Sequence, residues 1–142
     1  MILLDTNVLS EFMRLQPATQ VVVWLDRQAP NEIWTNAVSR AEIELGLALM
    51  PESKRQKSLS QAARTMFDED FAGRCLPFDE IAASYYGRIV STRTRMGRPI
   101  SVEDAQIAAI ALAYRMLLST RNTADFEDIA GLNVINPWET EA

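Results

Sequence analysis

The sequence predicts an α/β fold in which a mainly parallel sheet is covered by helices on both faces. Two observations lead to this prediction. Short apolar segments alternate with longer segments of helical periodicity along the chain, an order typical of βαβ units. The apolar segments are hydrophobic throughout, as expected for strands that are buried on both faces of a sheet.

The apolar segments define five predicted strands. The first is "MILL" at the start of the chain, and the others are similarly short. In chain order the predicted strands are residues 1–4, 33–35, 75–78, 117–119 and 133–135. Because the carboxyl ends of parallel strands form the ligand-binding edge of such a sheet, residues that directly follow these segments are candidate site residues.

The helical segments lie between the strands, and each has its own signature. A short helix is expected from about Asn7, and in the third helix Ala41, Leu45 and Ala48 share one apolar face. The fourth predicted helix is polar and is expected to be exposed on one side. The fifth ends at "MGRP", a helix stop signal. The sixth contains many alanines, which allow it to pack closely against its neighbours. After the first short helix, the predicted helices are residues 18–28, 39–49, 52–71, 79–95 and 101–114.

Length and composition indicate one soluble globular domain, residues 1–142. Hydrophobic residues make up 48% and charged residues 23% of the 142, and no repeat, low-complexity tract or linker interrupts the chain. No apolar segment is long enough to span a bilayer, and the first residues do not resemble a signal peptide. We therefore expect a cytoplasmic protein without membrane contact.

Missing residue types exclude several kinds of site. The chain has no histidine, which excludes a Ser-His-Asp triad and histidine-ligated zinc, and its single cysteine excludes an internal disulfide. The five glycines form neither of the common nucleotide-binding loops. The remaining chemical groups are carboxylates, hydroxyls, amides and arginines. The net charge of −5 argues against nonspecific nucleic-acid binding by the whole surface.

Four acidic residues stand out by their context: Asp5, Glu42, Asp104 and Asp125. Each also has a structural interpretation as part of a helix cap. Asp5 precedes a helix, and the other three acids each lie three residues after a serine or asparagine, the spacing of a capping box. The two interpretations are compatible, because a carboxylate in a first helical turn can cap the helix and still contact a ligand.

Polar residues that surround two of these acids favour a binding site. Thr6 and Asn7 follow Asp5, whereas Thr120 and Asn122 precede Asp125, at the ends of two predicted strands. An all-oxygen set of ligands without histidine or cysteine matches Mg²⁺ or Mn²⁺. A divalent cation would also relieve the repulsion between clustered carboxylates.

The chain resembles the PIN-domain ribonucleases, and more closely the VapC-type (FitB-like) toxins of bacterial toxin–antitoxin pairs. The resemblance extends over "MILLDTNVLSE", "SRAEIELGL", "GRPISVEDAQIAAIAL" and "LLSTRNTADFEDIAGLNVINPWE" in this order. By position, the acidic quartet of the family corresponds to Asp5, Glu42, Asp104 and Asp125. The supporting polar residue of the family corresponds to Thr120, with Asn122 as a candidate helper. The implied fold is a three-layer α/β/α sandwich with a five-stranded parallel sheet.

The resemblance implies metal-assisted hydrolysis of RNA phosphodiester bonds, with one or two Mg²⁺ or Mn²⁺ ions held by the four acids and no covalent nucleophile. It also implies a homodimer and a cognate antitoxin that inhibits the acidic site. The toxin–antitoxin complex would bind operator DNA through the antitoxin. Transfer RNA is a common substrate of such toxins. A groove for the antitoxin peptide is expected near five apolar residues, each of which has core packing as its alternative role: Leu9, Phe12, Met13, Leu47 and Met50.

Arginines near the third acid are candidate RNA contacts. Arg98 in "MGRPIS" is the preferred arginine, and Asn122 is the second candidate RNA contact. Arg88 and Arg93 fit a solvated helix face at least as well. Two other functions remain open from the sequence. One is a housekeeping RNA-processing nuclease of the same family. The other is a Mg²⁺-dependent phosphotransferase with Asp5 as nucleophile, although such sites usually need a further acid and a lysine near the strand end.

Overall fold

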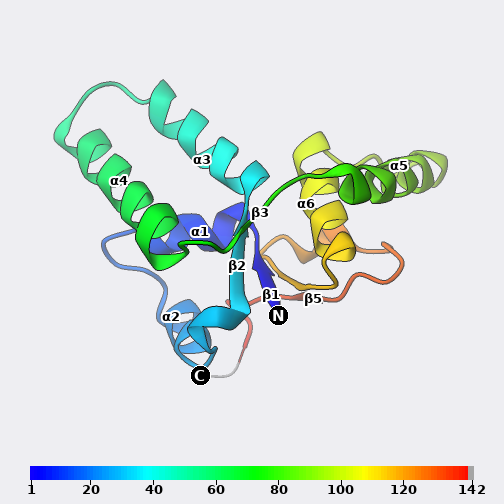
Figure 1. Ribbon diagram of the computed structural model, residues 1–142, viewed down its shortest axis with the longest axis horizontal. Coiled ribbons are helices and arrows are strands. Elements are labelled where there is room, and N and C mark those ends of the chain that lie inside the picture. The colour runs from blue at the N-terminus through cyan, green and yellow to red at the C-terminus, as the bar shows by residue number, and fades with distance from the viewer. Residues whose placement is uncertain (141–142) are drawn as a thin grey trace.

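The computed structural model describes residues 1–140, so the last two residues of the predicted domain lie outside the described residues (Figure 1). The five strands are β1 (Ile2–Leu4), β2 (Ile33–Asn36), β3 (Cys75–Leu76), β4 (Leu117–Ser119) and β5 (Val134–Ile135). The six α-helices are α1 (Thr6–Phe12), α2 (Thr19–Asp26), α3 (Ala37–Leu49), α4 (Lys54–Thr65), α5 (Glu80–Arg95) and α6 (Val102–Ala113). Short 3₁₀ turns η1 (Pro30–Glu32) and η3 (Thr123–Phe126) and a π-helical turn η2 (Met66–Asp70) complete the elements.

The strands form one parallel sheet in the order β3-β2-β1-β4-β5. The first strand is therefore central, and Leu3 pairs in register with Trp34 of β2 and Leu118 of β4. Helices α5 and α6 lie together on one side of the sheet, with α1 to α4 on the other (Figure 1). The predicted three-layer α/β/α fold with a five-stranded parallel sheet is confirmed.

Each face of the sheet has its own hydrophobic core. Leu3 and Leu118 pack with α5 and α6, whose alanines allow the two helices to approach closely. Leu4 packs on the opposite face with α1, α2 and the end of α4. Because alternate residues of a strand point to opposite faces, a strand buried on both faces must be apolar at every position, as β1 is.

Helices α3 and α4 lie side by side and extend away from the sheet (Figure 1). The face of α3 that contains Ala41, Leu45 and Ala48 is exposed, and Leu45 retains 60% of its surface. The three residues share one face as predicted, but this is not the face that packs on the core, since Ile43 and Leu47 make the core contacts instead. Helix α3 contacts α1, α4, α6 and β2, and the face that contains Leu45 is not covered by any of them.

The predicted helix over residues 52–71 is interrupted. Ser53 caps α4 with its hydroxyl, and the α-helix ends at Thr65, after which the π-helical turn buries Met66 and Phe67. Most other boundaries match the predicted ones within about two residues, a common uncertainty for helix ends. In the described part of the chain, no helix is both long and apolar enough to cross a membrane.

Candidate active site

Asp5 directly follows the central strand and is 4% exposed. Its backbone N–H donates to the carbonyl of Ser119 at 2.9 Å, which extends the β1–β4 pairing by one residue. Its Oδ1 accepts from the backbone N–H of Thr6 at 2.8 Å, so Asp5 is also the N-cap of α1. The sheet and the helix together fix the position of this carboxylate.

Thr120 and Asn7 hold the second oxygen of Asp5. The buried Thr120 hydroxyl donates to Asp5 Oδ2 at 2.7 Å and accepts from the backbone N–H of Asn122 at 3.1 Å. Asn7 Nδ2 lies 3.3 Å from the same hydroxyl and 3.4 Å from Asp5 Oδ2. The predicted supporting residue Thr120 thus contacts the first acid directly, whereas Asn122 contributes its main chain to this network.

Burial raises the pKa of the Asp5 carboxyl from 3.8 to about 6. The hydrogen bonds from Thr120 and Thr6 act in the opposite direction, and the negative charges of Asp104 and Glu42 raise the pKa further. A buried carboxylate that is repelled by neighbouring carboxylates is costly to ionise in the absence of a cation. Raised pKa values of this kind are concentrated at functional sites.

Glu42 reaches the site through Thr6. The Thr6 hydroxyl donates to Glu42 Oε1 at 2.7 Å and lies 2.8 Å from the hydroxyl of Ser39. The predicted capping box of Ser39 and Glu42 is wrong, because Asn36 caps α3 by accepting from the backbone N–H of Ser39 at 2.8 Å. Helix α3 therefore begins two residues earlier than predicted, and Glu42 lies in its second turn, free of a capping role.

Asp104 lies in the first turn of α6, where the Ser101 hydroxyl accepts from its backbone N–H at 3.1 Å. The predicted role of Ser101 as a cap is confirmed. Partial burial raises the pKa of the Asp104 carboxyl, and the charges of Asp125 and Glu103 act in the same direction. A hydrogen bond with Ser101 and the positive charge of Arg93 act against this increase. Asp104 therefore lies within electrostatic range of both Asp5 and Asp125.

Asp125 is exposed and lies on η3, after the end of β4. Asn122 precedes this turn without forming a side-chain cap, so the capping interpretation of this pair is wrong. The preferred RNA contact, Arg98, forms ion pairs with Glu127 and Asp128 on the same loop. Contact between Arg98 and RNA stays a prediction.

The donor set is chemically appropriate for a hard divalent cation, since every candidate ligand atom is an oxygen. Within residues 1–140, no three acidic or cysteine side chains are arranged as a ready ligand set for one ion. Mg²⁺ commonly retains several waters and binds protein through one or two carboxylates. The residues therefore fit an ion that one or two of the acids bind directly and the others contact through water.

Three further polar residues belong to this network: Thr6 and Asn7, which the sequence indicated as polar neighbours of Asp5, and Ser39, which was predicted only as a helix cap. Thr6 links Asp5 to Glu42, Asn7 bridges Thr120 and Asp5, and Ser39 lies beneath Thr6. The run "DTN" after an apolar strand is the sequence signal for the first two. No local signal identifies Ser39, because its partner is 33 residues away.

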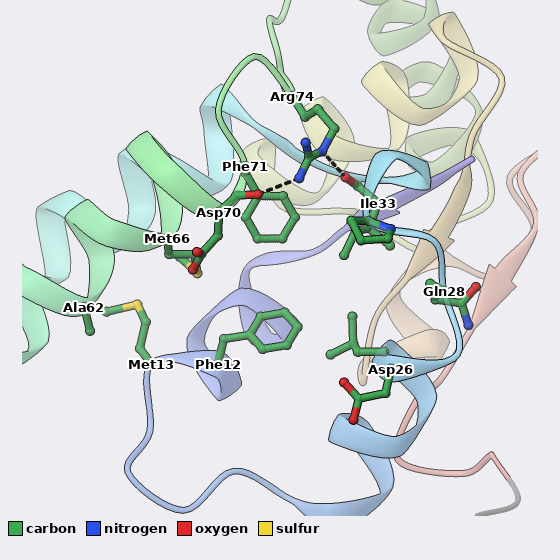
Figure 2. Close-up of a pocket in the computed structure, with 12 residues that line it drawn as sticks. Phe12, Met13, Asp26, Gln28, Ile33, Ala62, Met66, Asp70, Phe71 and Arg74 are labelled. Atoms are coloured by element: carbon green, nitrogen blue, oxygen red, sulfur yellow. Dashed lines mark hydrogen bonds between the residues drawn. The ribbon is translucent and has the colours of Figure 1, made fainter.

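A separate pocket of about 480 Å³ lies at the other end of α1 (Figure 2). Phe12, Met66 and Phe71 supply apolar surface, and Asp26 and Arg74 are among its charged residues. Figure 2 shows Arg74 donating to the carbonyls of Ile33 and Asp70, which fixes its guanidinium at the edge of the pocket. The pocket thus combines an aromatic interior with charged groups, a composition typical of a binding site.

Comparisons with known proteins match this chain over nearly its full length. Residues 2–132 match the family model described as PIN domain. Plasmid stability protein StbB of Pseudomonas syringae pv. tomato is 44% identical over 98% of this chain and 99% of its own. Toxin FitB of Neisseria gonorrhoeae is 41% identical over 97% and 99%, and VapC ribonuclease Y4jK of Sinorhizobium fredii is 39% identical over 98% and 99%.

A solved structure described as FitAB bound to an IR36 DNA fragment contains a similar chain. The two folds agree with a TM-score of 0.89 at 41% sequence identity, over 100% of this chain and 99% of that one. The agreement includes the whole sheet and therefore the edge at which the four acids lie.

Proposed function

The chain belongs to the PIN-domain family, which confirms its resemblance to VapC- and FitB-type proteins, and on this premise we propose that it is a metal-dependent endoribonuclease and the toxin of a toxin–antitoxin pair. The observation that carries the proposal is the environment of Asp5. Its carboxylate is buried at the end of the central strand and accepts a hydrogen bond from the hydroxyl of Thr120. The negative charges of Asp104 and Glu42 also act on it. The names of the relatives, a toxin and a VapC ribonuclease, support the same function.

Asp5 and Asp104 are the proposed direct ligands of one or two Mg²⁺ or Mn²⁺ ions, and Glu42 and Asp125 complete the set directly or through water. When bound, such an ion supplies Lewis-acid activation of water and neutralises charge on the phosphate. Thr120 keeps the Asp5 carboxylate in one orientation, and Thr6 does the same for Glu42. Their bonds fix the acids before substrate arrives, which is how supporting residues contribute to metal sites.

The phosphotransferase alternative finds little support in this geometry. Both oxygens of Asp5 accept hydrogen bonds, and the residue two positions later is Asn7 rather than a second acid. The only lysines of the chain, Lys54 and Lys57, are exposed on α4, which extends away from the sheet. A housekeeping RNA-processing nuclease would use the same acids, so only the partner and the cellular effect distinguish it from a toxin.

The proposed antitoxin would occupy the pocket beside α1. Of the five apolar residues predicted near the groove, Phe12 and Met13 line this pocket, whereas Leu9 is fully buried in the core. Leu47 lines a different hollow, between α3 and α4. An antitoxin arginine near the acids would be attracted by their charge. By analogy with FitAB, contact with operator DNA would be made through the antitoxin.

A homodimer and a cytoplasmic location complete the proposal. The exposed residues Ala41 and Leu45 of α3, together with the half-buried Val38, adjoin Gln106 of α6 in a shallow apolar hollow. A second copy of the chain would cover this face, which otherwise leaves Leu45 in water. The face lies beside Glu42, so dimerisation would enclose one side of the acidic site.

Cleavage of a panel of RNAs that includes transfer RNA tests the proposed function. We expect endonucleolytic products with Mg²⁺ or Mn²⁺, none with EDTA, and growth arrest when the protein is expressed alone. Asp104→Asn should abolish both effects, whereas Glu80→Gln, a matched change at an exposed acid in the first turn of α5, should leave them intact. Cleavage that persists in EDTA or in Asp104→Asn would contradict the proposal.

A further inference from the structure

Arg93 is a buried arginine on the last turn of α5, with 4% of its side chain exposed. Both predicted roles for Arg93, a solvated helix face and an RNA contact, require exposure and are wrong. Its guanidinium donates to three backbone carbonyls: Nε to Arg98 at 2.8 Å, and Nη1 to Asp125 at 3.0 Å and to Glu127 at 3.1 Å. Among residues 1–140 it forms no ion pair with a carboxylate within 4.0 Å.

These hydrogen bonds hold the loop that contains the fourth acid. Asp125 lies on a four-residue 3₁₀ turn, outside any α-helix or β-strand. Its backbone N–H donates to Asn122 and its carbonyl accepts from Arg93, so both of its backbone groups are bonded. The side chain of Arg98 binds the same loop from outside, through Glu127 and Asp128.

The charge of Arg93 also acts on the acidic site. Burying a guanidinium without a paired carboxylate costs free energy of folding, and a neutral hydrogen-bond donor would hold the loop at a lower cost. Arg93 lies close enough to Asp104 for its charge to stabilise the ionised carboxylate. One side chain therefore both fixes the main chain at Asp125 and offsets part of the repulsion among the acids.

We propose that Arg93 is a positioning residue, which holds the main chain of Asp125 against the acidic cluster and thereby sets the affinity of the site for its divalent cation. The proposal rests on the proposed function in that it assigns Asp125 to the metal site. Arg93 contacts neither the ion nor RNA, and it acts through the loop that it holds.

Arg93→Ala, Arg93→Lys and the control Arg95→Ala, at an exposed position of the same turn, test this role in the full chain. Binding of Mn²⁺ without RNA is measured by calorimetry, and loop order by hydrogen exchange. We expect Arg93→Ala to bind Mn²⁺ about 10–100-fold more weakly, the usual effect of losing a residue that supports metal ligands. Exchange should increase over residues 122–128 and around Arg98, whose carbonyl also accepts from Arg93, and remain unchanged elsewhere.

Kinetics and chemical rescue separate positioning from a general structural role. We expect kcat to fall with little change in KM for RNA, because Arg93 does not touch the substrate. Guanidinium ion should restore Mn²⁺ binding to Arg93→Ala, since it can refill the vacated site. Arg93→Lys should remain impaired, because its ammonium cannot reproduce the geometry of the guanidinium, and Arg95→Ala should match the parent.

Three results would overturn the proposal: an unchanged Mn²⁺ affinity in folded Arg93→Ala, increased exchange throughout the domain, or failure of both Arg93 variants to fold. The last two would show that the arginine supports the whole domain rather than one loop. Loss of Mn²⁺ affinity in Arg93→Ala, together with a parent protein that cleaves no RNA, would refute the proposed function and leave the positioning role intact.

Discussion

The two ends of helix α1 lie in opposite kinds of environment. At its N-terminus, Asp5, Thr6 and Asn7 belong to a network in which buried polar groups are hydrogen-bonded to residues far away in the sequence. At its C-terminus, Phe12 and Met13 line a pocket with an apolar interior. The first arrangement fixes charges that chemistry requires, whereas the second offers apolar area to a partner. One seven-residue helix thus carries the proposed catalytic surface at one end and the proposed antitoxin surface at the other.

The largest expected difference between the two ends is in RNA cleavage. Asp5→Asn should reduce kcat/KM by more than the roughly 100-fold upper range for residues that only support metal ligands. The reason is that asparagine keeps the shape of Asp5 but removes the charge that attracts the cation. Initial rates on a single RNA substrate measure the effect. If Asp5→Asn retains parental activity, the acidic network is not the catalytic end of α1.

The same substitution should have the opposite effect on the stability of the metal-free protein. Folded Asp5 keeps its proton up to about pH 6, whereas the unfolded chain releases it near 3.8. Folded protein therefore binds more protons between these values, and its stability falls as pH rises through this window. Asp5→Asn avoids this loss, so its unfolding free energy should exceed that of the parent by about 3 kcal/mol at pH 7.

Urea unfolding in EDTA at pH 4 and at pH 7 measures this difference. At pH 4 the two proteins should be nearly equal in stability, because Asp5 is then protonated in the folded state. Added Mg²⁺ should stabilise the parent and not the variant, since binding to the folded state alone raises stability. An advantage of Asp5→Asn that is equal at both pH values would show that ionisation of Asp5 is not its cause.

The smallest expected effect concerns the pocket. Phe12→Ala should weaken binding of the cognate antitoxin by about 2 kcal/mol, the threshold for an energetically important interface residue, and leave RNA cleavage unchanged. Calorimetry with the purified antitoxin measures the change. Leu15→Ala is the matched control, because Leu15 follows α1 but is 96% exposed and does not line the pocket. Equal antitoxin affinity of Phe12→Ala and the parent would show that the antitoxin does not bind at this end of α1.

The sequence by itself determined the features that depend on neighbouring residues. Every predicted strand is present, because a strand buried on both faces must be apolar along its length. Asp5 could be predicted as a site residue because it directly follows such a strand. Ser101 could be predicted as a helix cap because Asp104, whose backbone N–H it accepts from, lies three residues later. The family resemblance, which rests on four such motifs in order, was also available from the sequence and is confirmed.

Only the tertiary structure decided which side of a helix is buried and which distant groups meet. Arg93 fits a solvated helix face in the sequence, yet its partners at positions 125 and 127 bury it. Leu45 follows the apolar pattern of a core residue, but α3 extends beyond the sheet and leaves it in water. The spacing of apolar residues in the sequence predicts a helix and the residues that share each of its faces. The neighbours that cover those faces are set by packing between residues that are far apart in the chain.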